Sequence, residues 1–393
     1  MSGARTLRLI NQARILAVLY AQESASRAEL ARLLGLTRSA LTKHVGSLVS
    51  SGVIVETEEK SAPDRAGRPG VALRLNRREN FFFGAEIGGQ FVRTIALDFD
   101  ARVIAQRVKE FDPGASPEHV VGLLKHAIAE IVLEERLNAE RARGIGVAVS
   151  GLVTRAGVLL YSPALGWRNT PILDIVARHM GRFASTVVLN DANAAAFSEA
   201  YVERRLHEAE LAYLLVDVGV GVGILNEGRL FAGADGFAGE LGSLPLLLNK
   251  GPLGAAPRSL EAAIGRDGIF RLVDALGGTC RSIHEVEQFM TGKTRAGHEA
   301  LAIWLGWLAE ALVALTVVYD PREIRLGGRW IFPARSAFDG LLEAFHARLE
   351  EVRSGYPPPK VFFSALGEAG PAVGSACVLH ERLFSVSSVL KSP

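Results

Sequence analysis

Cysteine is scarce in this chain of 393 residues, which contains only Cys280 and Cys377. The two lie far apart and form no Cys-x-x-Cys pattern, which favours a reducing compartment and argues against a cysteine-rich zinc site. The N-terminal sequence MSGARTLRLINQAR lacks the apolar core of a signal peptide. These absences predict a cytoplasmic protein without a metal site.

Long apolar runs are also rare. Residues 300–319 form one run of about the length of a membrane span, but Glu310 lies at its centre. Inserting that charge would cost about 2.5–3.5 kcal/mol. We therefore expect a buried core helix and no membrane partner.

Net charge is small, at +2, but it is unevenly distributed. Residues 1–80 contain thirteen lysines and arginines against seven acids, and the remainder carries a slight excess of acids. The length allows two or three domains, and a hydrophobic content of 49% supports full cores. A basic first fifth on a mildly acidic body is typical of a nucleic-acid-binding module attached to a second domain.

Residues 26–52 predict two short helices joined by a tight turn. Ser26 can cap the first helix and Gly35 ends it, while Thr37 can cap the second, which runs to Gly52. Each helix keeps one apolar face, and the opposite face of the second is polar and basic, as a helix lying in a major groove requires. The alternative is a generic helical hairpin in an interface.

A first helix over 7–21 and a hairpin of strands 53–59 and 71–76 would complete a winged helix-turn-helix. Arg65 and Arg68 at the hairpin tip could reach phosphates or a minor groove, or belong to an ordinary solvated loop. His44 could touch a phosphate or be a tolerated surface residue. The candidate DNA-binding residues are Arg27, Thr37, Arg38, Ser39, Thr42, Lys43, His44, Arg65 and Arg68.

From residue 81 onward, strand-like and helix-like runs alternate in two series. Three strand-like runs come first, followed by a helix over 117–137 and a strand over 144–151. The second series starts with a strand over 185–191 and an alanine-rich helix, and includes a long helix over 297–319. This order predicts two α/β lobes with a cleft between them.

Three glycine-marked turns follow predicted strands, at 86–90, 217–223 and 325–330. Closely spaced glycines let backbone N–H groups approach a phosphate, although glycines also mark plain hairpins. Their repetition in both lobes indicates a cleft of the nucleotide or sugar-kinase type.

The chain resembles the ROK family, specifically its transcriptional regulators, the xylose- and N-acetylglucosamine-type repressors. After the helix-turn-helix and the GRP at 67–69, the matching segments are SPALGWRNTPI (162–172), NDANAAAFSE (190–199), GADGFAGELG (233–242), SLEAAIG (259–265), IRLGG (324–328) and SALGEAGPAVGSA (364–376).

The resemblance implies a winged helix-turn-helix over residues 1–80 and an α/β, two-lobed actin/hexokinase-like domain over 81–393. Lobe one would cover about 81–190 plus the C-terminal helix, and lobe two about 191–370. A homodimer or a dimer of dimers is expected, because helix-turn-helix proteins usually read two half-sites.

The chain departs from the family's kinases at the phosphate turns. Glu86 stands where they carry aspartate, and Gln90 replaces a threonine. Ile224 and Leu225 interrupt the second glycine run. A reshaped phosphate cradle should damage phosphoryl transfer, which depends on positioning and charge neutralisation. Ser243 stands where the family has a zinc-binding histidine, and the cysteines of the family's zinc site are absent from this chain. No metal is therefore expected.

A sugar pocket remains, with Asn190, Asp191, Glu240 and Glu261 as the ligand-binding residues that the resemblance implies. Acceptors and donors in fixed geometry suit hydroxyl pairs. Each has an alternative: Asp191 could cap the following helix, Glu240 could cap a turn, and Glu261 could be a solvated helix residue. Trp167 could line the pocket or pack within its lobe.

The sequence favours a DNA-binding transcriptional regulator, a repressor that binds double-stranded operator DNA and whose kinase-like domain senses a sugar or sugar derivative. We expect it to have no enzyme activity and no cofactor. One alternative is an ATP-dependent sugar kinase with an accessory DNA-binding domain and Asp191 as general base. Another is a regulator that has lost its sugar site and responds to a different partner.

Overall fold

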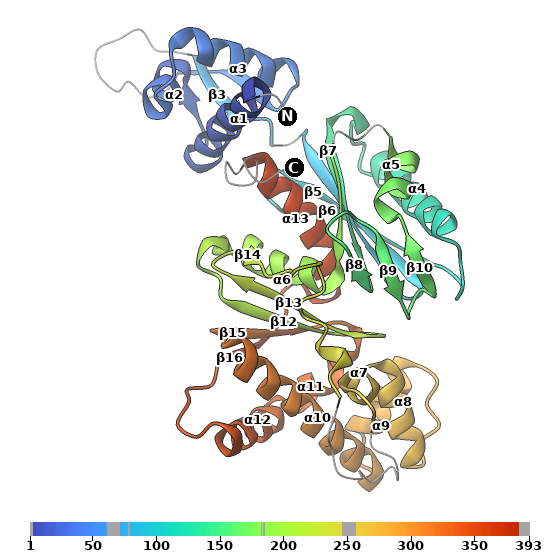
Figure 1. Ribbon diagram of the computed structural model, residues 1–393. Coiled ribbons are helices and arrows are strands. Elements are labelled where there is room, and N and C mark those ends of the chain that lie inside the picture. Colours follow the sequence, from blue (N-terminus) through green and yellow to red (C-terminus); the bar gives the residue numbers. More distant parts are fainter. Residues whose placement is uncertain are drawn as a thin grey trace.

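The computed structural model describes residues 3–60, 71–77, 79–181, 183, 185–245 and 257–384. A small N-terminal domain stands on a larger body that holds two central β-sheets (Figure 1). The two five-stranded sheets, with helices packed on them, give the two lobes that the sequence predicts.

The N-terminal domain is a winged helix-turn-helix. Its elements are α1 (Gly3–Gln22), β1 (Ala25–Ser26), α2 (Arg27–Leu34), α3 (Arg38–Ser50), β2 (Ile54–Lys60) and β3 (Val71–Leu75), with strand order β1-β3-β2. The predicted caps are confirmed: the Ser26 hydroxyl accepts from the Glu29 N–H at 3.2 Å, and the Thr37 hydroxyl accepts from the Ala40 N–H at 3.3 Å. Gly35 ends α2 at φ +64°, a conformation that favours glycine.

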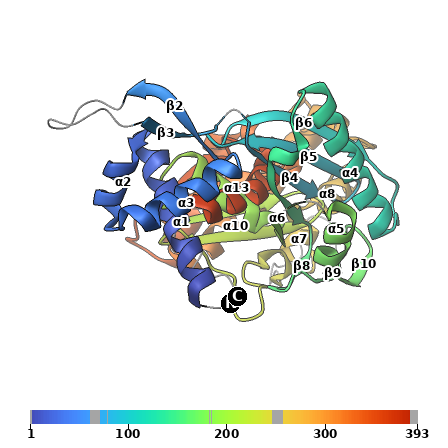
Figure 2. The ribbon, with the colours of Figure 1, turned by 90° about the horizontal axis from the view of Figure 1, so that it is seen from above.

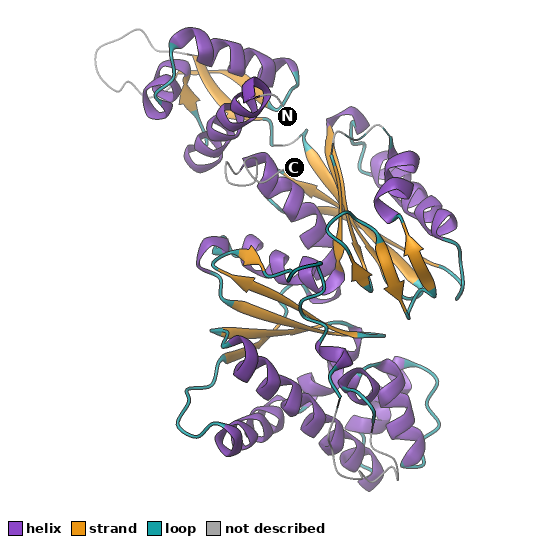
Figure 3. Cartoon of the chain, viewed as in Figure 1, coloured by secondary structure: helices purple, strands orange, loops and turns teal. Residues whose placement is uncertain are grey.

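The first large sheet has the order β11-β7-β4-β5-β6. Strands β4, β5 and β6 form the predicted antiparallel meander, while β7 and β11 run parallel to β4. Helices α4 and α5 cover one face, and a small sheet of β8, β9 and β10 extends this lobe (Figure 3). The bounds are β4 (Phe81–Ile87), β5 (Phe91–Asp98), β6 (Val103–Glu110), α4 (Pro117–Glu134), β7 (Ala142–Val149), β8 (Leu152–Val153), β9 (Leu159–Ser162), β10 (Trp167–Thr170), α5 (Ile172–Met180) and β11 (Thr186–Asn190).

The second large sheet has the order β14-β13-β12-β15-β16, and helices α7 to α12 pack on one of its faces. The bounds are β12 (Leu211–Val216), β13 (Val220–Asn226), β14 (Arg229–Leu230), α7 (Leu260–Ile264), α8 (Arg266–Ala275), α9 (Ile283–Thr291), α10 (Arg295–Tyr319), β15 (Glu323–Gly327), α11 (Phe332–Ser336), α12 (Phe338–Val352) and β16 (Lys360–Phe363). A break at Ala337 separates α11 from α12, which starts at Phe338.

Helix α10 is long and apolar enough to cross a membrane by length and composition, yet 56% of its apolar window is buried inside the protein. Trp304 and Leu308 are fully buried against the second sheet. Glu310 pairs with Arg348 of α12 at 2.8 Å. A helix packed in this way is the core helix that its central charge predicts.

Two helices, α6 (Asp191–Val202) and α13 (Gly370–Phe384), lie between the sheets. They approach so closely that a Cβ on Gly374 would sit 1.8 Å from the Ala194 carbonyl oxygen. Helix α13 also packs on β4 and β7, and its C-terminal end reaches α1 of the winged domain (Figure 2). The layer of α6 and α13 therefore contacts both sheets and the winged domain.

Candidate functional site

The two faces of α3 differ. Its inner face packs in the core of the winged domain, and its outer face presents polar and basic side chains. Leu41 and Val45 are at most 1% exposed, so they anchor the helix. The exposed predicted residues of this face are Thr37, Arg38, Ser39, Thr42 and Lys43, and His44 is half-buried. An anchored helix with an exposed polar and basic face is the arrangement that a recognition helix needs.

Four of the predicted DNA-binding residues need comment. Arg27 forms an ion pair with Glu56 of β2, so its guanidinium faces the wing strand. Arg65 and Arg68 lie outside the described residues. Partial burial and the positive charges of Lys43 and Arg8 lower the pKa of His44.

Arg8 is a residue that sequence reasoning missed. It is exposed on α1, and its charge acts on His44 because the two helices pack side by side. The signal available in the sequence was the basic N-terminal segment itself.

The junction of β11 and α6 carries the first pair of predicted ligand-binding residues. Asn190 is the helix cap: its Oδ1 accepts from the Asn193 N–H at 3.0 Å, and its Nδ2 donates to the Gly151 carbonyl at 3.1 Å. The alternative reading of Asp191 as the cap is therefore wrong. Asp191 is the first helical residue, and its Oδ1 accepts from the Ala192 N–H at 2.9 Å.

Asp191 is buried among other carboxylates. Burial raises its pKa to about 7, and the charges of Asp217 and Glu240 act in the same direction, while hydrogen bonds from Ala192 and Ser150 oppose the rise. Loss of solvent and the charge of Glu261 raise the pKa of Glu240 to about 6. Asp191 and Glu240 therefore lie close enough for their charges to interact, and so do Glu240 and Glu261.

Glu261 in α7 is half-buried, and its Oε2 accepts from the Val220 N–H at 3.1 Å, so it is not simply a solvated helix residue. Glu240 stands at the start of a 3₁₀ turn but makes no capping hydrogen bond there. Trp167 packs within its lobe, because its ring is buried and its Nε1 donates to the Ala115 carbonyl at 2.8 Å.

The glycine turns at 86–90, 217–223 and 325–330 do converge, as predicted, but the space between them holds side chains. The space between the lobes at this point is lined by residues that include Glu86, Arg93, Asp217 and Glu368, and it is too narrow to admit a water molecule. The Arg93 guanidinium pairs with Glu368 at 2.6 Å and lies 3.5 Å from the Glu86 carboxylate. We call Arg93 and Glu368, with Arg329 at 3.9 Å from Glu368, the inter-lobe latch.

Backbone donors that could hold a phosphate are already bound to carboxylates in this cleft. Asp217, which sequence reasoning missed, accepts from the N–H groups of Val218 at 2.8 Å and Arg329 at 3.3 Å. Glu261 takes the Val220 N–H. Burial raises the pKa of Glu86 well above its usual range, with Asp217 among the charges that add to the rise. In this structure carboxylates, rather than a phosphate, therefore occupy these backbone donors of the turns.

The residues present also do not suit the family's structural zinc. Ser243 is exposed in a 3₁₀ turn and offers a hydroxyl where imidazole is needed. In the part of the chain that the structure describes, no three His, Cys, Asp or Glu side chains are grouped to hold a metal ion.

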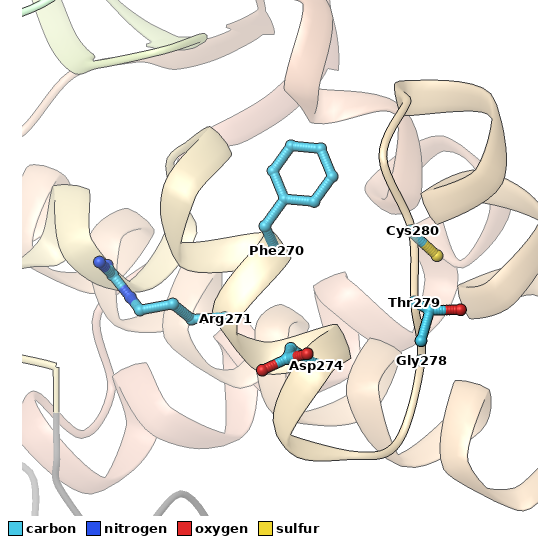
Figure 4. Close-up of a pocket in the computed structure, with 6 residues that line it drawn as sticks. All are labelled: Phe270, Arg271, Asp274, Gly278, Thr279 and Cys280. Carbon is cyan, nitrogen blue, oxygen red and sulfur yellow. The ribbon is translucent and has the colours of Figure 1, made fainter.

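A cavity of about 370 Å³ lies apart from the inter-lobe space, among α8 and the following loop (Figure 4). Phe270, Arg271, Asp274 and Cys280 line it. Burial and the charge of Glu285 raise the pKa of the Cys280 thiol, so it is a poor nucleophile.

Known proteins resemble both parts of the chain. A xylose repressor of Bacillus subtilis (strain 168) is 24% identical over 388 residues, covering 96% of each chain. A xylose repressor of Caldicellulosiruptor bescii is 29% identical over 244 residues, covering 62% of this chain, which thus spans about 60% of that relative's length. A glucokinase of Pyrobaculum calidifontis is 26% identical over 313 residues, 76% of this chain and 95% of its own.

Among solved structures, a ROK family transcriptional regulator, described as a homolog of the E. coli MLC protein, superposes with a TM-score of 0.73 at 19% identity over 98% of both chains. This confirms the predicted winged helix followed by a two-lobed actin/hexokinase-like domain. The MarR family model matches residues 7–66. The ROK family model matches residues 82–382, more than half of the chain, and this protein belongs to the ROK family.

Proposed function

We propose that this protein is a DNA-binding transcriptional repressor of the cytoplasm whose ROK domain senses a sugar or sugar derivative and performs no phosphoryl transfer. One observation carries the proposal: an exposed basic recognition helix stands on a ROK body whose phosphate cradle is filled by the inter-lobe latch. The relatives named xylose repressors support it.

The sugar would lie at the β11–α6 junction. Asn190, Asp191, Glu240 and Glu261 would bind its hydroxyls. Asn190 and Asp191 are adjacent at this junction, the charge of Glu240 acts on Asp191, and that of Glu261 acts on Glu240. An alcohol hydroxyl donates to a carboxylate and accepts from an amide, so the set fits a polyol ring. Binding must favour one lobe arrangement over another to change DNA affinity.

The DNA would be double-stranded operator, read by two copies of the chain at two half-sites. Fluorescence anisotropy with upstream DNA, at about 0.15 M salt, tests this with and without D-xylose, D-glucose and N-acetylglucosamine. We expect specific binding that one of these sugars changes. An absence of specific DNA binding would contradict the proposal.

Removal of recognition-helix side chains provides the matched test. Arg38→Ala should weaken operator binding by about 1–3 kcal/mol if Arg38 reads a base, and Lys43→Ala should weaken all sequences and lower the salt slope by about 1 if Lys43 meets a phosphate. Arg295→Ala, at an exposed position at the start of α10, serves as the control. Equal affinities for all three variants would exclude α3 as the reading helix.

A sugar kinase is the second candidate. The glucokinase relative favours it, as does Asp191, because a carboxylate with a pKa of about 7 suits a general base. A coupled ADP-release assay with hexoses, pentoses and amino sugars decides between the two. We expect no turnover, and turnover that Asp191→Asn abolishes would establish the kinase instead.

A further inference from the structure

His380 of α13 lies at the centre of a buried aromatic cluster where three parts of the molecule meet. Its ring is 0% exposed. The neighbouring rings lie 4.6–6.0 Å from it, centroid to centroid, and come from α1, from the first sheet and its β5–β6 turn, from α6 and from the last turn of α13. We call this the junction cluster: Tyr20, Phe82, Phe99, Tyr201, His380 and Phe384.

Hydrogen bonds fix the central ring. The His380 Nε2 lies 3.1 Å from the Phe99 carbonyl oxygen, and its Nδ1 lies 2.6 Å from the Tyr201 hydroxyl. A carbonyl can only accept, so Nε2 carries the proton and Nδ1 accepts from Tyr201. Burial lowers the pKa of His380 to about 4, which keeps the ring neutral at neutral pH. This chain of bonds joins α6, α13 and the first sheet.

Helix α6 connects the sugar-binding candidates to this cluster. Asn190 caps its first turn, and Tyr201 lies eleven residues later, about 16 Å along the axis at 1.5 Å per residue. Ten of its twelve residues are buried. A helix packed on both sides shifts as a unit, so a displacement at its first turn reaches the Tyr201 hydroxyl.

The winged domain is held at the same place. Tyr20 lies in the last turn of α1, and its ring contacts the rings of His380 and Phe384. Arg77 donates to the Tyr20 carbonyl at 3.1 Å, pairs with Asp100 of the body and lies over the Tyr20 ring at 5.3 Å. These contacts make the position of α1 depend on the end of α13.

We infer that the junction cluster is the link by which ligand occupancy of the cleft repositions the winged domain, with Tyr201 as the positioning residue that couples α6 to His380. This inference rests on the proposed sugar-sensing function. Its physical basis is that one buried helix carries both a cleft cap and a direct bond to the ring against which the DNA-binding domain packs.

The first experiment uses the full-length chain and two Tyr→Phe variants. Tyr201→Phe removes only the bonding hydroxyl, and Tyr356→Phe removes an exposed hydroxyl beyond α12 as the control. Calorimetry measures binding of D-xylose and D-glucose, and anisotropy measures operator affinity with and without each sugar. We expect the variants to bind sugar and operator as the parent does.

The response to sugar should separate them. In the parent and in Tyr356→Phe the sugar should change operator affinity by about tenfold, and in Tyr201→Phe by less than about threefold. An undiminished response in Tyr201→Phe overturns the inference.

If neither sugar binds, that result counts against the proposed function but not against the link. A second measurement then tests the link by itself. Asn190→Ala loosens the α6 cap, and hydrogen exchange is followed in the last turn of α1, around Tyr20. We expect exchange there to rise by about twofold in the parent background and to stay unchanged in the Tyr201→Phe background. An equal effect in both backgrounds, or none in either, overturns the link.

Discussion

Burial favours the neutral form of two side chains in the α6–α13 layer, the Asp191 carboxyl and the His380 imidazole. It raises the pKa of Asp191 to about 7 and lowers that of His380 to about 4. The two shifts have opposite consequences for stability against pH, because the folded Asp191 binds more protons than the unfolded one, and the folded His380 binds fewer.

For Asp191, the folded pKa lies above the usual 3.8, so its contribution to stability falls as pH rises from 4 to 7. Asp191→Asn keeps an acceptor for the Ala192 N–H and removes the charge. In urea unfolding, we expect the free energy of unfolding of the variant to exceed that of the parent by up to about 4 kcal/mol at pH 8. Near pH 4 the two should match. Asp174→Asn, at an exposed acid in α5, is the control. A constant difference across this range would show that Asp191 ionises normally.

For His380, the folded pKa lies below the usual 6.5, so its contribution to stability falls as pH drops from 6.5 to 4. In long-range ¹⁵N–¹H NMR of the histidine-labelled chain, the His380 ring should stay neutral and protonated at Nε2 until the pH falls to about 4. His380→Phe should lose that signal and so assign it. A His380 ring that titrates near 6.5 would be incompatible with its buried position.

Local residue roles were predictable, and long-range ones were not. Ser26 and Thr37 cap helices because their partners lie three residues away. The role of Asp217 depends on Arg329, which reaches it only after three strands and several helices intervene. No local sequence pattern indicates contacts between residues so far apart in the chain. The inter-lobe latch and the junction cluster could therefore be identified only in the folded structure.

Among the elements, helices α6 and α13 pack so closely that position 374 of α13 leaves no room for a side chain. Glycine at 374 lets the two helix backbones approach, and glycine at 223 does the same where β13 meets Ala192 of α6. The second glycine run therefore serves helix–sheet packing at Gly223 as well as the turn itself. The sequence predicted the elements through their hydrophobic periods, whereas their close approach depends on tertiary packing.

Gly374→Ala should destabilise the protein by at least about 1–3 kcal/mol, because the added methyl meets the backbone oxygen of Ala194 and cannot be accommodated by a side-chain rotation. Gly306→Ala is the matched control in α10, where a Cβ would meet nothing within 4 Å. That change should stabilise by about 0.4–1 kcal/mol through the unfolded chain. Urea unfolding measures both, and equal effects would show that α6 and α13 are not in tight contact.

At the scale of the whole molecule, two connections set how the parts are held. The inter-lobe latch joins β5 to the segment that follows β16, and the junction cluster joins the body to the winged domain. The ROK fold supplies the lobes, and the chain uses the phosphate position for ion pairs between them. Lobe arrangement and the position of the winged domain share the α6–α13 layer, so a change in one is expected to reach the other.

Glu368→Gln tests the latch across the cleft. The amide carries no charge to pair with Arg93, which is 8% exposed and, among the described residues, keeps Glu86 as its one remaining carboxylate within 4 Å, at 3.5 Å. We expect the lobes to open, so small-angle X-ray scattering should give a larger radius of gyration, and sugar binding should weaken. Glu134→Gln breaks the ion pair of Glu134 with Arg107 within lobe one and is the control, since that pair spans no cleft. If both variants keep the parent's radius, side-chain packing rather than the ion pairs holds the lobes, because charge removal alone would then leave their arrangement unchanged.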